Sequence, residues 1–190
     1  MHAKATSWLC TTAGSFLSVG RWWIAATVGA LAFWVSGCGA GGQTPEPAGP
    51  LPSAIAVEVC SQKAQAQVDE ALGQSTTAVT TPTWVSHLYA CNYVYRQGVI
   101  AMSVQELSSQ AQTTAYYDRL GAQYGNKQLL FGLGQGAFLT ANGSVVVRKD
   151  WKVLLVNTTD LKGSFSSSRS LSGTPAETIA SVIMACWAGD

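Results

Sequence analysis

Three segments of the chain carry hydrophobic residues at the spacing of an amphipathic helix. The first covers residues 61–72, the second covers residues 109–124, and the third begins at Thr174, where Pro175 and Glu177 complete an N-terminal capping box. A glycine directly follows each of the first two segments, as is common where a helix ends. The hydrophobic positions that define these predicted helices are Ala64, Val68, Ala71 and Leu72, then Tyr116, Leu120 and Tyr124, and finally Ile179, Val182, Ile183 and Cys186.

Between the first two predicted helices the hydrophobic pattern changes to a period of two, which predicts β-structure. Residues 85–95 form the first predicted strand, and Gln97 and Gly98 turn the chain into a second strand at residues 99–107. The two strands are expected to pair as a hairpin. The residues that share one face of the first strand are Val85, His87, Tyr89, Cys91, Tyr93 and Tyr95.

Three further strands are predicted before the last helix. Residues 137–141 and 144–149 flank the dipeptide of Asn142 and Gly143, which is the strongest short hairpin signal because both turn residues accept positive φ. A second two-residue turn then leads into residues 152–158, whose hydrophobic centre is typical of a buried strand.

The predicted order is helix, two strands, helix, three strands, helix. Hairpins separated by helices are typical of an antiparallel sheet, whereas a parallel sheet needs strands and helices in regular alternation. We therefore expect an α+β fold, in which an antiparallel sheet of about five strands packs its helices on one face.

A hydrophobic run near the N-terminus has the features of a bacterial lipoprotein signal. Residues 22–35 are uncharged and follow Arg21, and the small residues Ser36 and Gly37 stand directly before Cys38. A secretory signal needs a basic start, a hydrophobic run of about 7–15 residues and small residues at the cleavage site. The pattern predicts cleavage before Cys38 and attachment of a diacylglycerol to its thiol. An uncleaved membrane anchor is the alternative, but a span of about 20 residues would enclose Arg21.

These features divide the chain into a signal peptide at residues 1–37, a lipidated Cys38 with a flexible tether at residues 38–53, and one globular domain at residues 54–190. The tether is rich in Gly and Pro and carries a single charge, so it buries too little surface to fold. Two acyl chains, palmitate among them, would hold Cys38 stably in a membrane. We expect a lipid-anchored protein on the extracytoplasmic face of the cell membrane.

Charge is sparse and balanced in the expected domain. The whole chain has 11 Lys and Arg and 10 Asp and Glu, and two of the basic residues precede Cys38. A domain that binds nucleic acid needs a basic patch to neutralise phosphates. The longest basic cluster, at residues 148–152, includes an aspartate and is predicted to form the polar end of a hairpin. Nucleic acid is therefore excluded as a partner.

Three cysteines follow Cys38, and outside the cytoplasm two of them are expected to form a disulfide. Cys60 and Cys91 are the preferred pair because each stands at the edge of a predicted element, whereas Cys186 lies on the hydrophobic face of the last helix. Pairings of Cys186 with Cys60 or with Cys91 remain open. As a free residue, Cys186 is expected to be a buried small hydrophobic side chain.

No combination of residues in the expected domain is typical of a catalytic or metal site. His87 is its only histidine and lies in a predicted strand, so a Ser-His-Asp site or a zinc site lacks its usual components. Neither a Cys-x-x-Cys nor a Gly-x-Ser-x-Gly motif occurs. Gly132, Gly134 and Gly136 are reminiscent of a phosphate-binding loop, but a strand and not a helix follows them. We expect no catalytic residues, no metal and no cofactor.

Two groups of side chains remain as candidates. The neighbours Asp69 and Glu70, like Asp118 and Arg119, are predicted on exposed helix faces, where solvated surface is the usual interpretation. A concave patch of aromatic residues between sheet and helices would suit a hydrophobic or sugar ligand, although core packing is expected for most of them. These aromatic residues are Trp84, Tyr89, Tyr93, Tyr95, Tyr116, Tyr117, Tyr124, Phe138 and Trp151.

The order of several motifs resembles a family of actinobacterial lipoproteins that is defined only as a domain of unknown function. The shared features are the lipoprotein signal, the Pro-rich tether, a cysteine that opens a helix, a second cysteine just before an aromatic residue, a Gly-rich turn and a hairpin. Together they cover about residues 54–188. This chain differs at Cys186 and at Gln135, where an acidic residue is common. The shared features stand at Cys38, Cys60, Cys91 to Tyr93, Gly132 to Phe138 and residues 145–156.

This resemblance implies a bridge between Cys60 and Cys91 and a place in the cell envelope, but it supplies no reaction. A looser resemblance is to the extracellular sensor domains of mycobacterial membrane kinases, which are also disulfide-linked α+β domains. We therefore expect a non-enzymatic envelope lipoprotein that binds a hydrophobic, glycan or protein ligand. An envelope hydrolase, and a sensor or assembly partner of a membrane complex, are the alternatives.

Overall fold

One antiparallel sheet organises the part of the chain that the structure, a computed structural model, describes: residues 45–162 and 173–187. Seven of its eight strands lie in the order β1-β3-β4-β8-β7-β6-β5. The eighth, β2, pairs with β3 beside β1, so that β1 and β2 pair with successive parts of β3. The strands are β1 Ala78–Val79, β2 Thr83–Val85, β3 Leu88–Tyr95, β4 Gly98–Glu106, β5 Asn126–Leu130, β6 Gly136–Thr140, β7 Val145–Lys149 and β8 Lys152–Asn157.

Four helices accompany the sheet in the described residues, and a hydroxyl side chain caps the N-terminus of each. The side chains of Ser53, Ser61, Ser109 and Thr174 accept a hydrogen bond from a backbone N–H in the first turn of the helix that follows. Gly73 ends the second helix in the left-handed conformation, with φ of 63°. The helices are α1 Ala54–Glu58, α2 Gln62–Leu72, α3 Gln110–Tyr124 and α4 Pro175–Trp187.

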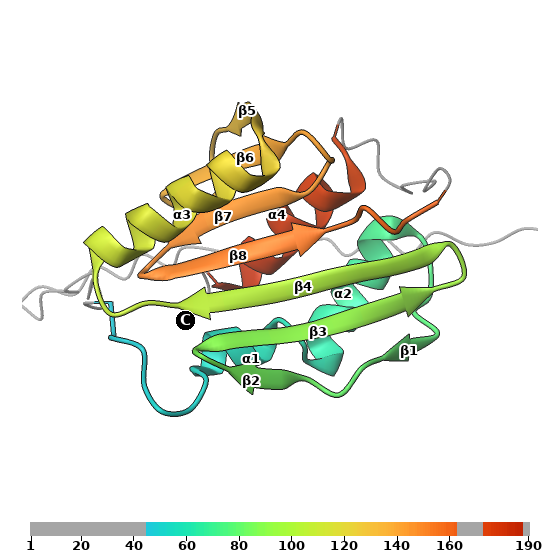
Figure 1. Cartoon of the computed structure of the whole chain (residues 1–190). Coiled ribbons are helices and arrows are strands. Elements are labelled where there is room, and N and C mark those ends of the chain that lie inside the picture. Colours follow the sequence, from blue (N-terminus) through green and yellow to red (C-terminus); the bar gives the residue numbers. More distant parts are fainter. Residues whose placement is uncertain (1–44, 163–172, 188–190) are drawn as a thin grey trace, which may run out of the picture. The chain divides into compact units, whose positions relative to one another are not determined.

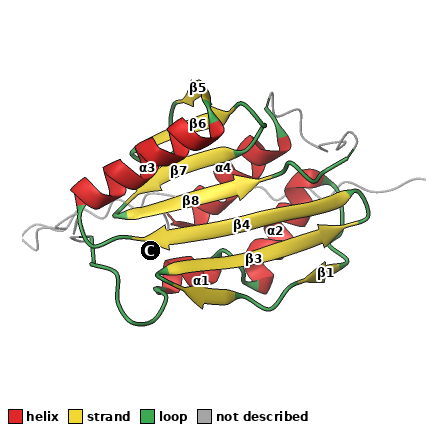
Figure 2. Cartoon of the chain, in the orientation of Figure 1, coloured by secondary structure: helices red, strands yellow, loops and turns green. Residues whose placement is uncertain are grey.

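The helices cover both faces of the sheet. On one face, α1, α2 and α4 pack their hydrophobic side chains into the larger core, together with residues of β3, β4, β6, β7 and β8. On the opposite face, α3 packs over β6, β7 and β8 around Leu120, Phe138, Val146 and Val153. Figure 1 shows α3 on the near face and the other three helices behind the sheet. No described helix covers the near face of β3 and β4 (Figure 2).

The α+β class and the antiparallel sheet are confirmed, but the expected strand number, order and helix placement are wrong. The sheet has eight strands and not about five, with α1, β1, β2 and β5 as additional elements. β1 and β2 have only two and three residues, too few to show a period, and β5 is polar and exposed. α3 does not share a face with the other helices, because Val145, Val146 and Val147 are all buried. A strand that buries consecutive side chains needs cover on both faces.

The strand predicted at residues 85–95 is divided by a turn. Ser86 and His87, with φ of 51° and 61°, connect β2 to β3 as a two-residue hairpin. His87 is therefore an exposed turn residue and not part of the strand face that buries Cys91 and Tyr93. Neither residue of this turn is Gly or Asn, so the usual sequence signal for positive φ is missing.

The hairpin predicted around Asn142 and Gly143 is confirmed, but its loop has three residues. The N–H of Thr140 donates to the carbonyl of Ser144 at 2.8 Å, which leaves residues 141–143 as the loop. Within this loop only Gly143 has positive φ, at 85°, as expected for the last residue of a three-residue loop.

The last residues of the predicted tether pack against the domain. Trp84 Nε1 donates to the carbonyl of Pro50 at 3.0 Å, and the N–H of Ser53 donates to Glu106 Oε1 at 3.0 Å. The segment available as a spacer is therefore shorter than residues 38–53. No helix in the described ranges is long and hydrophobic enough to span a bilayer.

Candidate functional site

A groove of about 960 Å³ runs between α4 and the connection from β5 to β6. Its volume lies near the upper end of the roughly 300–1,000 Å³ that is typical of ligand sites. We call it the α4 groove. It is lined by residues 128–135, by Lys149 and Gly173, and by Glu177, Thr178, Ser181, Met184 and Ala185 of α4.

The helical wall of the groove is fixed at both ends. The N–H of Thr174 donates to Glu177 Oε2 at 2.6 Å and the N–H of Glu177 donates to Thr174 Oγ1 at 3.2 Å, so the predicted capping box is confirmed. At the other end, Lys149 Nζ donates to the carbonyl of Trp187 at 3.2 Å, where a cation also interacts favourably with the helix dipole. The wall is therefore preformed.

The opposite wall is a hydrophobic loop that two leucines hold on the domain. Leu130 and Leu133 are half-buried and pack against the larger core. Gly134, with φ of 56°, approaches the carbonyl of Arg148 so closely that a Cβ would lie 2.7 Å from that oxygen. Between these anchors, Phe131 is 92% exposed. The fold therefore holds a large hydrophobic side chain in solvent at the rim of the groove.

The α4 groove offers hydrophobic contact and hydrogen bonds, but its described residues bring no reactive pair together. Lys149 and Glu177 are its two charged residues, and both are engaged at the ends of α4. The hydroxyl of Ser181 donates to the backbone carbonyl of Glu177 at 2.8 Å. An activated nucleophile needs a neighbouring base, and neither histidine nor cysteine is among the lining residues described above. The arrangement is suited to binding.

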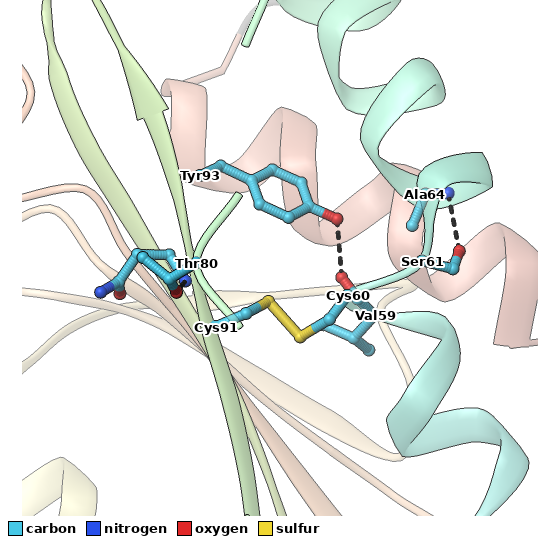
Figure 3. The surroundings of a disulfide bond; sticks show 8 residues. Val59, Cys60, Ser61, Ala64, Thr80, Cys91 and Tyr93 are labelled. Atoms are coloured by element: carbon cyan, nitrogen blue, oxygen red, sulfur yellow. Dashed lines mark hydrogen bonds between the residues drawn. A yellow bond between two sulfur atoms is a disulfide. The ribbon is translucent and has the colours of Figure 1, made fainter. Parts of the chain in front are cut away.

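The structure contains the preferred disulfide. Cys60, between α1 and α2, is bonded to Cys91 in β3 with their Cα atoms 6.1 Å apart, so the bridge ties the helical layer to the sheet (Figure 3). Cys186 is a free thiol and only half-buried, with Sγ 2.8 Å from Gln67 Oε1. The expectation that Cys186 is buried is therefore wrong, since its side chain is partly exposed. Cys38 lies outside the described residues, and its lipidation stays a prediction.

The carboxylate of Asp69 stabilises the fold through hydrogen bonds and is not the solvated surface group that the sequence predicts. Its carboxylate accepts hydrogen bonds from the N–H of Thr76 at 3.0 Å and from the hydroxyl of Tyr95 at 2.8 Å. These bonds fix the chain that follows α2 against β3. Burial raises the pKa of Tyr95, so this phenol stays a neutral donor at ordinary pH.

The other polar candidates lie outside the α4 groove. The ring of His87 packs edge-on against Trp84, with centroids 5.6 Å apart. Asp118 and Arg119 are exposed, as expected. Within residues 45–162 and 173–187, no group of three or more His, Cys, Asp and Glu side chains could hold a metal ion.

The basic residues near the β7–β8 turn do not form one patch. Arg148 lies on the α3 side, with its guanidinium carbon 5.2 Å from the ring centroid of Tyr117. Lys149 lies on the α4 side, at the carbonyl of Trp187. Lys152 is buried. The three basic residues predicted at the polar end of one hairpin therefore lie in three different environments.

The nine aromatic candidates do not form a concave patch, because most of them build the two cores. Phe131 is the aromatic residue that lines the α4 groove, and it is not among the nine candidates. The available signal is the hydrophobic run at residues 129–131, which directly precedes a glycine and belongs to none of the predicted strands. The core-building residues are Tyr93, Tyr95 and Phe138, which are buried, and Tyr89, Tyr116, Tyr117 and Tyr124, which pack against the buried clusters.

Comparisons of the chain with protein-family models, with curated proteins and with solved structures find no match. The resemblance to the actinobacterial lipoprotein family, which depends on the order of short motifs around Cys38, Cys60 and Cys91, therefore stays a prediction.

Proposed function

We propose that this chain is a membrane-anchored lipoprotein of the cell envelope, which binds a ligand or partner through the α4 groove and catalyses no reaction. The motif that ends at Cys38 supports the anchor. The disulfide between Cys60 and Cys91 agrees with an oxidising compartment.

The rim of the groove is the observation that carries the binding proposal. Phe131 and Leu129 are 92% and 56% exposed, and they border the same hollow. A contiguous exposed hydrophobic surface typically marks a binding site. Covering one large hydrophobic side chain stabilises a complex by about 1.5–3 kcal/mol, so a ligand that covers Phe131 gains binding free energy at this rim.

A fluorescent hydrophobic probe tests the groove. The full chain in detergent is titrated with anilinonaphthalene sulfonate, and the signal of the same detergent without protein is subtracted. Phe131→Ser should weaken saturable binding about tenfold or more, and Leu129→Ser should weaken it less. Val85→Ser is the matched control, because Val85 is 67% exposed but does not line the groove. Equal binding by the three variants would remove the support for this site.

The anchor is tested by the mass of the protein purified from its membrane. We expect a chain that begins at Cys38 and carries a diacylglycerol, and we expect Cys38→Ser to abolish the modification. An unmodified chain with an intact N-terminus would overturn this part of the proposal. Screening against esters and glycosides tests the absence of catalysis, and turnover that one Ser or Asp substitution abolishes would favour the hydrolase alternative.

A further inference from the structure

We propose that the ligand of the α4 groove is an extended segment of a partner polypeptide, which adds as a strand to the free edge of β5. The inference rests on the proposed function and narrows it to one class of ligand. The segment would place hydrophobic side chains between Phe131 and α4, and an acidic side chain near Lys127.

The free edge of β5 is the first observation. β5 is the last strand in the sheet order, and among the described residues it pairs only with β6. Gln128, Leu129 and Leu130 all line the groove. Successive side chains of a strand point to opposite faces, so three consecutive lining residues mean that the groove borders the backbone edge itself. Unpaired N–H and C=O groups of such an edge are a template for another strand.

The dimensions and polarity of the groove favour a peptide over an acyl chain. From Glu177 to Ala185 the helical wall is about 12 Å long, which matches about four residues of an extended chain. The lining contains hydrophobic residues together with amides and hydroxyls. A peptide can contact the hydrophobic residues and pair with the backbone edge of β5, whereas an acyl chain would leave the N–H and C=O groups of that edge without a partner strand. The polar lining residues besides Lys149 and Glu177 are Gln128, Gln135, Thr178 and Ser181.

Charge and register decide against a second copy of this chain as the occupant. The pairing of β5 with β6 shifts register between Asn126 and Gln128, so Lys127 is the extra residue of a bulge. Lysine and bulges on an edge strand discourage indiscriminate pairing. A second copy would add another Lys127 to the same edge, and like charges on neighbouring strands are destabilising where they lie opposite each other. An acidic segment meets the exposed Lys127 favourably.

A display library of random peptides tests the inference, with the full chain in detergent as bait. We expect enriched peptides to alternate hydrophobic and polar residues and to carry acidic residues. A synthetic copy of one enriched peptide should bind the Val85→Ser control with the Kd of the parent chain. Phe131→Ser should bind it about ten- to hundredfold more weakly, and Lys127→Glu about two- to fivefold more weakly. Both residues are exposed, so neither change threatens folding.

Strand addition has its own signature. N-methylation of one alternate set of peptide residues should abolish binding, while methylation of the other set should not, because only every second N–H of an edge strand faces its neighbour. Hydrogen exchange should slow, when the peptide is bound, at those backbone amides of residues 128–130 that point away from β6. Equal binding of both methylated forms, or unchanged exchange, would overturn the inference.

Other occupants give different results. If the library yields nothing but a fluorescent fatty acid binds in a manner that Phe131→Ser abolishes, the peptide inference fails and the proposed binding function stands. A dimer that sedimentation detects and that Phe131→Ser dissociates would assign the groove to a second copy, and would also overturn the inference. If neither peptide, fatty acid nor a second copy binds, both proposals fail.

Discussion

The hydroxyl of Tyr93 donates a hydrogen bond of 2.9 Å to the backbone carbonyl of Val59, the residue that directly precedes the disulfide cysteine Cys60. Tyr93 and Cys91 lie on the same face of β3, two residues apart, so a hydrogen bond and a covalent bond attach the junction between α1 and α2 to one strand (Figure 3). The larger core closes over both, since Tyr93 and Cys91 are almost fully buried.

Removal of the disulfide should destabilise the domain substantially. Cys60 and Cys91 are separated by 31 residues, and closing a loop of this length stabilises a fold by about 3–4 kcal/mol in the chain-entropy model. Urea unfolding of the double variant Cys60→Ser, Cys91→Ser measures the loss. Cys186→Ser is the control and should change the unfolding free energy by less than about 1 kcal/mol. A midpoint that stays the same when a reductant opens the bridge would contradict this account.

The hydrogen bond of Tyr93 should contribute separately. Tyr93→Phe keeps the ring but leaves the buried carbonyl of Val59 without its donor, and an unsatisfied buried group costs about 1–3 kcal/mol. The same substitution in the chain that lacks the disulfide shows whether the two attachments act together. Because they fix the same junction, we expect their combined effect to differ from the sum of the single effects.

Alkaline pH should weaken the fold through the same side chain. Burial, with smaller contributions from the carboxylates of Asp69 and Glu58, raises the pKa of Tyr93 above its ordinary value. In the unfolded chain the phenol ionises near pH about 10. The folded chain therefore keeps a proton that the unfolded chain releases, so the stabilisation is complete below that pH and falls as the pH rises through it.

The pH dependence is measured by urea unfolding of the parent and Tyr93→Phe, both with Cys186→Ser to prevent thiol exchange. Above pH about 10, the parent should lose up to about 1.4 kcal/mol per pH unit through this group, and the variant should lack that loss. The advantage of the parent over the variant should therefore shrink with rising pH. A constant difference would show that the phenol of Tyr93 titrates as it does in the unfolded chain.

Gly98 is the position where an added methyl group should do most damage. It has φ of 132°, and a Cβ there would lie 2.0 Å from the carbonyl oxygen of Asp160. Gly98→Ala must displace backbone at the start of β4, and we expect a loss of about 2–4 kcal/mol in unfolding free energy. Gly132→Ala is the matched control, because Gly132 also has positive φ, 80°, but no atom within 4 Å of the added Cβ. Equal losses in the two variants would exclude the close contact as the cause.

Periodicity predicted the long elements and missed the short ones for a physical reason. α2, α3 and α4 are 11, 15 and 13 residues long, so each has room for a hydrophobic repeat, and β3 and β4 have eight and nine residues. The hydrophobic pattern does not separate β2 from β3, because the alternation continues through the turn at Ser86 and His87. The placement of α3 depends on which face of the sheet has uncovered hydrophobic side chains. The sequence of the helix itself does not contain this information.

The candidate site was less accessible to sequence analysis than the fold. Phe131 and Leu129 have the composition of core residues, and their exposure follows only from the way Leu130, Leu133 and Gly134 hold the loop. Glu177 was predicted in its capping role, but nothing in the sequence places α4 beside the β5–β6 connection, about 45 residues earlier in the chain. The groove and its rim therefore depend on tertiary packing between segments that are distant in the sequence.

The capping box of α4 gives the last prediction, because it sets where the helical wall of the groove begins. Thr174→Ala removes the acceptor of the Glu177 N–H and should lower the unfolding free energy by about 1 kcal/mol, or the Tm by about 3–5 °C. Thr174→Ser keeps the hydroxyl and should cost less than half as much. Hydrogen exchange in the first turn of α4 should speed up in Thr174→Ala alone. If the alanine and serine variants behave alike, the methyl group of Thr174 and not its hydroxyl stabilises the helix start.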